Sequence, residues 1–248
     1  MTSIIHPTAS VGKGTLIGEY CVIEKGVVIG ADCQIGHHVV IHENTHIGNG
    51  VRIDDFASIG KQPMKAANSA TTSDQLQPPS RIEDGTIIGS GAVLYAGCTI
   101  GSRALIADLS TVREQVKIGE RTIIGRGAAI ENCCVIGSYS KLETNVYLCA
   151  YSQIGDRCFV APGVITSNDN YAGRTKERFN HFKGVTLATG GRIGAGAVIC
   201  PGKTISSDGF AAAGSVVTQD VPEKIIVAGV PAKELRPVPP EQWLENQE

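Results

Sequence analysis

Aliphatic residues return at every sixth position along almost the whole chain. The first run extends from Ile5 to Ile59, the second from Ile82 to Val160, and the third from Leu187 to Val217. With Thr166 in the next slot of the second run, the three runs contain ten, fifteen and six repeats. A period of six fits neither the 3.6-residue period of a helix nor the two-residue alternation of an ordinary strand. The pattern therefore predicts a repeat architecture.

Each repeat has a second regular feature. A small residue stands four positions after the aliphatic one, as at Ala9 and Cys21, and a glycine often follows the aliphatic residue directly, as at Gly12 and Gly18. One large and one small inward residue in six, with a residue that permits a tight turn, describes a short strand and a corner. Stacked units of this kind form a parallel β-helix, in which each coil buries its face against the next.

The same pattern accounts for five of the eight cysteines. They occupy the small inward position and are Cys21, Cys33, Cys98, Cys134 and Cys158. A free cysteine in such a place behaves as a small hydrophobic residue. Their spacing implies neither a disulfide framework nor a metal site.

Composition narrows the class of protein. The 248 residues carry a net charge of -2 and are 42% hydrophobic, without the basic stripe that a nucleic-acid partner would need. No apolar run reaches membrane-spanning length, and the N-terminus lacks the charged and apolar regions of a secretory signal. We therefore expect a cytoplasmic protein that neither inserts into membranes nor binds nucleic acid.

The motif [LIV]-G-x-x-[small]-x resembles that of the hexapeptide acyltransferases. This resemblance implies an all-β, left-handed parallel β-helix with three hexapeptides per coil and about ten coils, and it implies a homotrimer. The handedness comes from the resemblance alone, because general chirality rules favour a right-handed crossover. We expect the β-helix domain to cover residues 1–220, with loops 61–81 and 168–186 extruded, and a short, partly helical C-terminal tail to cover residues 221–248.

The two interruptions of the repeat follow repeats ten and twenty-five. Both numbers leave a remainder of one on division by three, so both loops should leave from the same corner, five coils or about 24 Å apart. The first loop, rich in Ser, Ala, Gln and Pro, could be functional or a simple spacer. The second combines aromatic residues with Arg174, Arg178 and His181, a mixture that favours contact with a ligand or a neighbouring subunit.

The C-terminal segment resembles the signature of acetyl-CoA-dependent hexapeptide transferases, at residues 213–222 and 229–233. Small residues would leave a smooth groove for a pantetheine arm, and nearby cations would contact phosphates. The residues that this resemblance assigns to acetyl-CoA are Ala195, Lys203, Ala212, Ala213, Lys233 and Arg236.

The segment from Thr144 to Arg174 resembles the nucleotide-sugar N-acetyltransferases that complete amino sugars for surface polysaccharides. The implied catalytic residues are Asn145 and Asp169, which would lie near the sugar amine. His181 could be the general base, unless the amine arrives neutral and needs none. The implied substrate-binding residues are Glu131, Asn132, Asn168, Tyr171 and Arg174. Ala150 departs from some sugar 3-N-acetyltransferases, which have Glu there, so the position of the acetylated amine stays open.

Other interpretations remain. An acyl carrier protein could supply a longer acyl chain, or the β-helix could be a scaffold without catalysis. His37 and His42 have the spacing of the zinc histidines of γ-class carbonic anhydrases, but the third ligand that zinc needs has no counterpart, so we expect no metal. The stretch "DDFASIGKQP" and its loop resemble the lipid A UDP-N-acetylglucosamine acyltransferases, whose catalytic His would fall at Tyr95.

Overall fold

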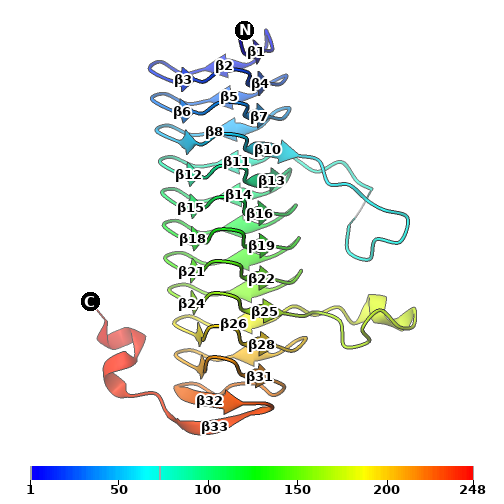
Figure 1. Cartoon of the computed structure of the whole chain (residues 1–248), viewed down its shortest axis with the longest axis vertical. Coiled ribbons are helices and arrows are strands. Elements are labelled where there is room, and N and C mark those ends of the chain that lie inside the picture. Colours follow the sequence, from blue (N-terminus) through cyan, green and yellow to red (C-terminus); the bar gives the residue numbers. More distant parts are fainter. Residues whose placement is uncertain (1, 73, 248) are drawn as a thin grey trace.

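The computed structural model describes residues 2–72 and 74–247, and its long solenoid has three parallel sheets as faces (Figure 1). The first sheet contains β1 (Ile4–Ile5), β4 (Val22–Ile23), β7 (Val40–Ile41), β10 (Ser58–Lys61), β13 (Val93–Tyr95), β16 (Thr111–Val112), β19 (Ala129–Ile130), β22 (Tyr147–Leu148), β25 (Ile165–Thr166), β28 (Val198–Ile199) and β31 (Val216–Val217). The second contains β2 (Ser10–Val11), β5 (Val28–Ile29), β8 (His46–Ile47), β11 (Arg81–Ile82), β14 (Thr99–Ile100), β17 (Lys117–Ile118), β20 (Val135–Ile136), β23 (Gln153–Ile154), β26 (Thr186–Leu187) and β29 (Thr204–Ile205). The third contains β3 (Leu16–Ile17), β6 (Gln34–Ile35), β9 (Arg52–Ile53), β12 (Ile87–Ile88), β15 (Leu105–Ile106), β18 (Ile123–Ile124), β21 (Lys141–Leu142), β24 (Phe159–Val160), β27 (Arg192–Ile193), β30 (Phe210–Ala211), β32 (Ile225–Gly229) and β33 (Ala232–Pro237).

The predicted fold class, a left-handed parallel β-helix, is confirmed. Within the uninterrupted runs each strand pairs in parallel with the strand three further along, as Ile106 does with Ile124, so that 18 residues separate equivalent positions. The chain passes from the first sheet to the second, then to the third, and back to the first. We name the three corners edge 1–2, edge 2–3 and edge 3–1 after the sheets that they join.

The repeat residues form the core. Ile88, Ile106 and Ile124 are completely buried, and so are the small residues that accompany them. All five cysteines predicted as core residues are buried and free. At several coils the small residue is Ser or Thr and its hydroxyl donates to a carbonyl fifteen residues later, as Thr122 does to Gly137 at 2.7 Å. Such a hydroxyl is satisfied inside an apolar core, whereas those of Thr45 and Ser215 have no partner among the described residues.

Glycine after the aliphatic residue has a steric cause. A Cβ atom on Gly119 would lie 2.5 Å from the backbone nitrogen of Ser138 in the next coil. A side chain at that corner would push the two coils apart, so the close stacking of the repeat requires glycine there.

Two details differ from the expectation. The sheets have eleven, ten and twelve strands, so the coil count is slightly higher than ten. After residue 220, β32 still pairs in parallel with β30 and then forms an antiparallel hairpin with β33. Only after this hairpin does the expected helical part follow, as the 3-10 helices η2 (Pro240–Gln242) and η3 (Leu244–Asn246).

Both long loops leave from edge 1–2, as predicted. The first connects β10 to β11, and the second connects β25 to β26 and contains the 3-10 helix η1 (Glu177–Asn180). Figure 1 shows both loops projecting from the same side of the solenoid. Among residues 2–72 and 74–247, no helix has the length and apolar character to cross a membrane.

Candidate functional site

A cluster of polar side chains lies on edge 1–2 between the two loops. Tyr95, Arg113 and Glu131 stand at or directly after the ends of β13, β16 and β19, and Glu114 and Asn132 are the next residues in two of these coils. Because the coils stack in register, these residues form two adjacent columns. We call the five residues the edge cluster.

Arg113 is the centre of the edge cluster. Its Nε lies 2.8 Å from Oε2 of Glu114 and its Nη2 lies 3.2 Å from Oε1, which makes a bidentate pair. Its Nη1 lies 3.5 Å from Oε2 of Glu131, and its guanidinium lies over the Tyr95 ring at 4.9 Å from the centroid. The Glu114 side chain is 4% exposed. A carboxylate so deeply buried needs a charged and hydrogen-bonded partner, which Arg113 provides.

Glu131 differs from Glu114 because its side chain is 25% exposed. Burial raises the pKa of Glu131, Arg113 pulls it back, and the negative charge of Glu114 raises it further, so that the pKa lies above its ordinary value. Burial, together with the nearby Glu131, also raises the pKa of Tyr147 to about 12. The cluster thus combines a fixed cation with an accessible carboxylate that can exchange a proton.

The first loop docks on this cluster. The contacts run from Arg113 Nη2 to Thr72 Oγ1 at 3.0 Å, from Asn132 Nδ2 to the Thr71 carbonyl at 3.0 Å, and from Gln115 Nε2 to Gln77 Oε1 at 2.8 Å. Two successive coils therefore hold the loop in place. Asn132 is 2% exposed, and its Oδ1 has no hydrogen-bond partner among the described residues. A buried acceptor left unpaired is unusual and marks a place where a ligand donor could bind.

In the second loop, Asp169 is engaged by its own loop. Its Oδ1 accepts from the Tyr171 N–H at 2.9 Å, and its Oδ2 accepts from the Gly173 N–H at 3.0 Å and from Arg178 Nη1 at 2.9 Å. Burial acts to raise the pKa of Asp169, but these N–H donors and Arg178 outweigh it and lower the pKa. The observed role of Asp169 is to order the loop; its predicted role at a sugar amine stays a prediction.

The other predicted residues of this loop lie either at its neck, where it leaves the solenoid, or further out. The Asn168 carbonyl accepts from the Lys183 N–H at 3.0 Å and closes the neck of the loop. Tyr171 and His181 face each other further out, with ring centroids 5.7 Å apart, and the His181 side chain is 51% exposed beside Glu177. Arg174 is exposed. The second loop leaves edge 1–2, which also carries Glu131 and Asn132. It starts five coils after the start of the first loop.

Asn145 lies on a different edge. It stands between β21 and β22 on edge 3–1, is exposed, and adopts a left-handed φ of 58°, a conformation that asparagine tolerates well. Three of the residues assigned to acetyl-CoA follow on edge 3–1, namely Ala195, Ala212 and Ala213. Within one chain, Asn145 is therefore not brought to the edge cluster.

The remaining acetyl-CoA candidates are divided. Lys203 lies on edge 1–2, between β28 and β29, whereas Lys233 and Arg236 are exposed on β33. Lys233 also lines a cavity of about 310 Å³ at the C-terminal end of the solenoid, together with Pro222 and Ala232. The sequence-predicted residues thus occupy two edges and one end of the molecule.

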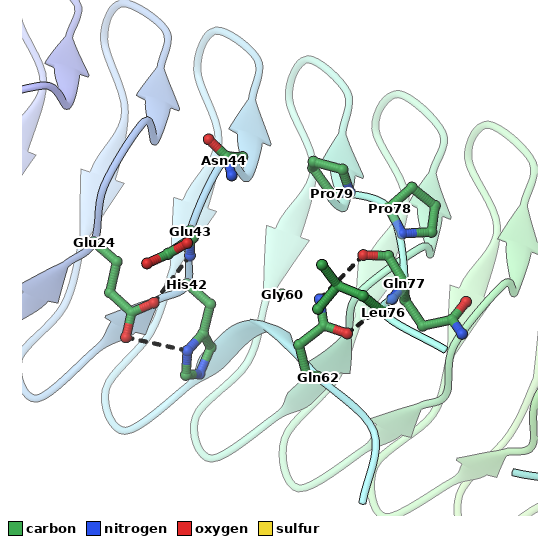
Figure 2. A pocket seen from close by; sticks show the side chains of 10 residues that line it. All are labelled: Glu24, His42, Glu43, Asn44, Gly60, Gln62, Leu76, Gln77, Pro78 and Pro79. Carbon is green, nitrogen blue, oxygen red and sulfur yellow. Dashed lines mark hydrogen bonds and ion pairs between the residues drawn. The ribbon is translucent and has the colours of Figure 1, made fainter. Parts of the chain in front are cut away.

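The largest cavity described, about 510 Å³, lies at the N-terminal side of the first loop (Figure 2). Its residues are Glu24, His42, Glu43, Asn44, Gly60, Gln62, Leu76, Gln77, Pro78 and Pro79. His42 lies here on edge 1–2, but His37 lies on edge 3–1, where its Nδ1 accepts from the Glu19 N–H at 2.9 Å. The two histidines do not converge within one chain. No group of three or more His, Cys, Asp or Glu in residues 2–72 and 74–247 is placed to hold a metal ion.

The sequence interpretation named Glu131 and Asn132 but missed Arg113, Glu114 and Tyr147. For Arg113 the sequence contained a signal. Polar residues at the first position after a strand recur at 18-residue spacing in Tyr95, Arg113 and Glu131, which predicts one stacked column. The docking of the first loop on this column had no comparable signal.

The repeat is similar to that of known proteins. The family model described as bacterial transferase hexapeptide (six repeats) matches residues 8–43, 21–55 and 79–114. The Saccharomyces cerevisiae protein YJL218W, named as an acetyltransferase, is 36% identical over 83 residues, which are 32% of this chain and 42% of that protein. The galactoside O-acetyltransferase of Escherichia coli is 39% identical over 54 residues, which are 22% of this chain and 27% of that enzyme. The chain thus spans less than half the length of these relatives.

Among solved structures, the UDP-N-acetylglucosamine O-acyltransferase of Moraxella catarrhalis has a similar fold. The TM-score is 0.55 at 21% sequence identity, and the match covers 96% of this chain and 73% of that one. At this level of identity the likeness establishes the fold.

Proposed function

Because this chain is a hexapeptide-repeat protein with the left-handed β-helix fold of bacterial acyltransferases, we propose that it transfers an acyl group to a sugar. In the finer form of this proposal, the donor is acetyl-CoA, and the acceptor is the amine of a UDP- or dTDP-linked amino sugar for surface polysaccharide synthesis in the cytoplasm. The finer form rests on the resemblance of residues 144–174 and of the C-terminal segment to enzymes of that kind.

The observation that carries the proposal is the edge cluster between the two inserted loops. A coil needs only one large and one small inward residue to stack, so neither a buried Arg113–Glu114 pair nor a half-buried Glu131 is required by the repeat. Charged groups that are buried and clustered in this way are typical of functional sites. The unpaired Oδ1 of Asn132 supports the same position for a substrate donor group.

The chemistry needs few groups. The sugar amine attacks the thioester carbonyl, a C–N bond forms, the C–S bond breaks, the thiolate leaves, and the amine loses one proton. We assign this proton to Glu131, which is partly exposed and has a raised pKa, with His181 as the alternative base. Holding the two reactants in line supplies several kcal/mol of the rate enhancement. Arg113 fixes the Glu131 carboxylate.

The division of residues between edges supports a site shared by two copies. The edge cluster and the second loop lie on edge 1–2, whereas Asn145 and the small residues assigned to acetyl-CoA lie on edge 3–1. In a three-fold assembly of prisms, edge 1–2 of one copy can face edge 3–1 of the next. We therefore propose a homotrimer with its active sites between subunits.

A second candidate acceptor is a sugar hydroxyl, favoured by the identity to the galactoside O-acetyltransferase. The test is incubation of the protein with acetyl-CoA and UDP- or dTDP-linked sugars, followed by mass spectrometry. An acetyl product that resists alkaline hydroxylamine is an amide and supports the finer form. A sensitive product is an ester and supports the second candidate. A product formed only with acyl carrier protein as donor contradicts the use of acetyl-CoA.

The placement of the donor is tested separately. Replacing Lys233 and Arg236 by Ala should raise the Michaelis constant for acetyl-CoA and leave that for the sugar nearly unchanged. Charge-assisted contacts to phosphate contribute about 1.5–3 kcal/mol each at most. If the double variant alters only the sugar constant, the donor lies elsewhere.

A further inference from the structure

Three side chains of the first N-terminal coils form a relay that the proposed transferase site does not use. Ser58 Oγ lies 3.1 Å from Nε2 of His42, and Nδ1 of His42 lies 3.4 Å from Oε1 of Glu24. Glu24, His42 and Ser58 come from successive coils of edge 1–2 and the first sheet. A hydroxyl, an imidazole and a carboxylate in this order are the arrangement that activates a serine nucleophile.

The carboxylate end of the relay is fixed. Glu24 Oε2 accepts from the Glu43 N–H at 3.0 Å, which leaves Oε1 directed at His42 (Figure 2). The negative charge of Glu24 beside Nδ1 favours the imidazole tautomer with its proton on that nitrogen. In that tautomer Nε2 is an acceptor, and the Ser58 hydroxyl is the donor.

Two of the three relay residues border the 510 Å³ cavity, and Ser58 lies next to its lining residues. His42 and Glu24 line it with side chains that are 28% and 35% exposed, and Gly60, two residues after Ser58 on β10, lines it as well. Ser58 is itself half-buried rather than enclosed. The side-chain amide of Asn44 also lines the cavity, and it forms no hydrogen bond to any residue that the structure describes, so it remains available as a donor.

The repeat does not require this serine. Ser58 points outward from β10, and the equivalent residues of neighbouring strands in the first sheet are Val22, Val40 and Val93. A valine would keep the sheet intact. The relay is therefore explained by chemistry better than by packing.

We propose that Ser58, His42 and Glu24 form a second, hydrolytic site for small carboxylic esters. Ser58 Oγ attacks the ester carbonyl while His42 Nε2 takes its proton, and His42 then returns this proton to the departing alcohol. Water attacks the acyl-serine, His42 takes a proton from the water and returns it to Ser58, and a carboxylic acid leaves. Glu24 positions His42. Because Glu24 and Glu43 line the cavity and no Lys or Arg does, neutral or cationic esters fit better than anionic ones.

The experiment uses p-nitrophenyl acetate with the full-length protein, followed by mass spectrometry of the peptide that contains Ser58. We expect hydrolysis with one acetyl group on Ser58, and a loss of about 100-fold or more in Ser58→Ala and His42→Ala. Glu24→Gln should lower kcat about 10-fold with KM unchanged, because it acts through the histidine. Thr111→Ala is the matched control. Thr111 follows Tyr95 in the sequence by the same number of residues as Ser58 follows His42.

Each outcome decides the proposal. Hydrolysis by Ser58→Ala at the wild-type rate would mean that His42 acts alone or that another residue reacts, and either result overturns it. If neither the wild type nor Ser58→Ala hydrolyses the ester, the proposal is overturned too. The proposed transferase function is independent of this site, since Ser58→Ala leaves the edge cluster intact and Glu131→Gln leaves the relay intact.

Discussion

At the scale of single residues, the side chains with chemical potential are those that the repeat leaves free. Inward positions are restricted to aliphatic or small residues by the stacking of the coils, as the complete burial of Ile106 and Ala128 illustrates. At several strands of the first sheet the residue directly after the strand is partly exposed at edge 1–2 and is not restricted by the repeat. Glu24, His42, Arg113 and Glu131 all occupy this position.

Glu131→Gln tests the assignment of the proton acceptor. Turnover should fall by about 10²–10³-fold, as for loss of a general base. Because burial raises the pKa of Glu131, the acid limb of the wild-type pH–rate profile should be displaced upward from that of an ordinary glutamate, and the variant should lack it. A variant with the wild-type acid limb would show that another group titrates.

The raised pKa of Glu131 also predicts the sign of the change in stability that Glu131→Gln causes. A carboxyl group whose folded pKa is raised stabilises the fold in its protonated form, and this contribution is lost as the pH rises through the folded pKa. At neutral pH the ionised Glu131 is therefore unfavourable relative to a neutral side chain. We expect urea unfolding to show Glu131→Gln at least as stable as the wild type at neutral pH, with the difference vanishing in acid.

Asp169→Asn tests the second loop at one residue. The β-helix should survive, because the loop lies outside its core, and turnover should fall by about 10²–10³-fold. The structure adds a second readout, since asparagine has one acceptor oxygen and cannot accept both from the Tyr171 N–H at one position and from the Gly173 N–H and Arg178 at the other, as the carboxylate does. Hydrogen exchange in residues 168–186 should increase. The control is His181→Ala: if it is crippling while Asp169→Asn is nearly silent, the histidine is the base.

At the scale of elements, the two loops are additions to an intact scaffold. On either side of the first loop, β8 pairs with β11 and β11 with β14 in regular register. The loop nevertheless docks on two successive coils through Thr71, Thr72 and Gln77. The register made the loop predictable as an insertion, but only the docked structure identifies it as a cover for the edge cluster.

Removal of the first loop tests this conclusion. Joining Gln62 to Ser80 through a short glycine linker should leave the circular dichroism spectrum of the β-helix unchanged, because the strand register does not depend on the loop. Activity in the transferase assay should be lost, because Arg113 and Asn132 lose their cover. Thr72→Val is the milder partner variant, which removes one hydrogen bond, worth about 1 kcal/mol, and should lower activity only partly. Full activity without the loop would identify it as a spacer.

At the scale of the whole molecule, no single chain brings all the predicted residues together. Edge 1–2 and edge 3–1 border the first sheet on opposite sides, so Glu131 and Asn145 face away from one another in one prism. A shared site between copies resolves this separation and requires an oligomer. A monodisperse monomer by light scattering would contradict both the homotrimer and the shared site.

Complementation provides the sharper test. Glu131→Gln disables edge 1–2, and Asn145→Ala disables edge 3–1, so each variant alone should be impaired. When the two are unfolded, mixed in equal amounts and refolded together, about one quarter of the interfaces in a cyclic trimer combine two intact edges. Activity should recover to about that fraction of the wild type. Mixed trimers that stay as inactive as the parents would show that both residues act in the same subunit.

The sequence by itself determined the β-helix, its inward columns, the edge from which both loops leave and the core role of five cysteines. These features follow from a local rule repeated every six residues, in which each coil contacts only its neighbours, so that spacing along the chain gives position in space. Glu131 and Asn132 could be named because they obey this rule within one or two coils.

Only the tertiary structure decided what the two loops do and which side chains meet. Thr71 and Thr72 reach Asn132 and Arg113 across some sixty and forty residues, and no periodic rule governs an insertion. Asp169 was identified from sequence, but its engagement by Arg178 and two backbone N–H groups depends on the folded path of the loop. The Ser58–His42–Glu24 relay likewise depends on side-chain directions and on a cavity that the first loop completes.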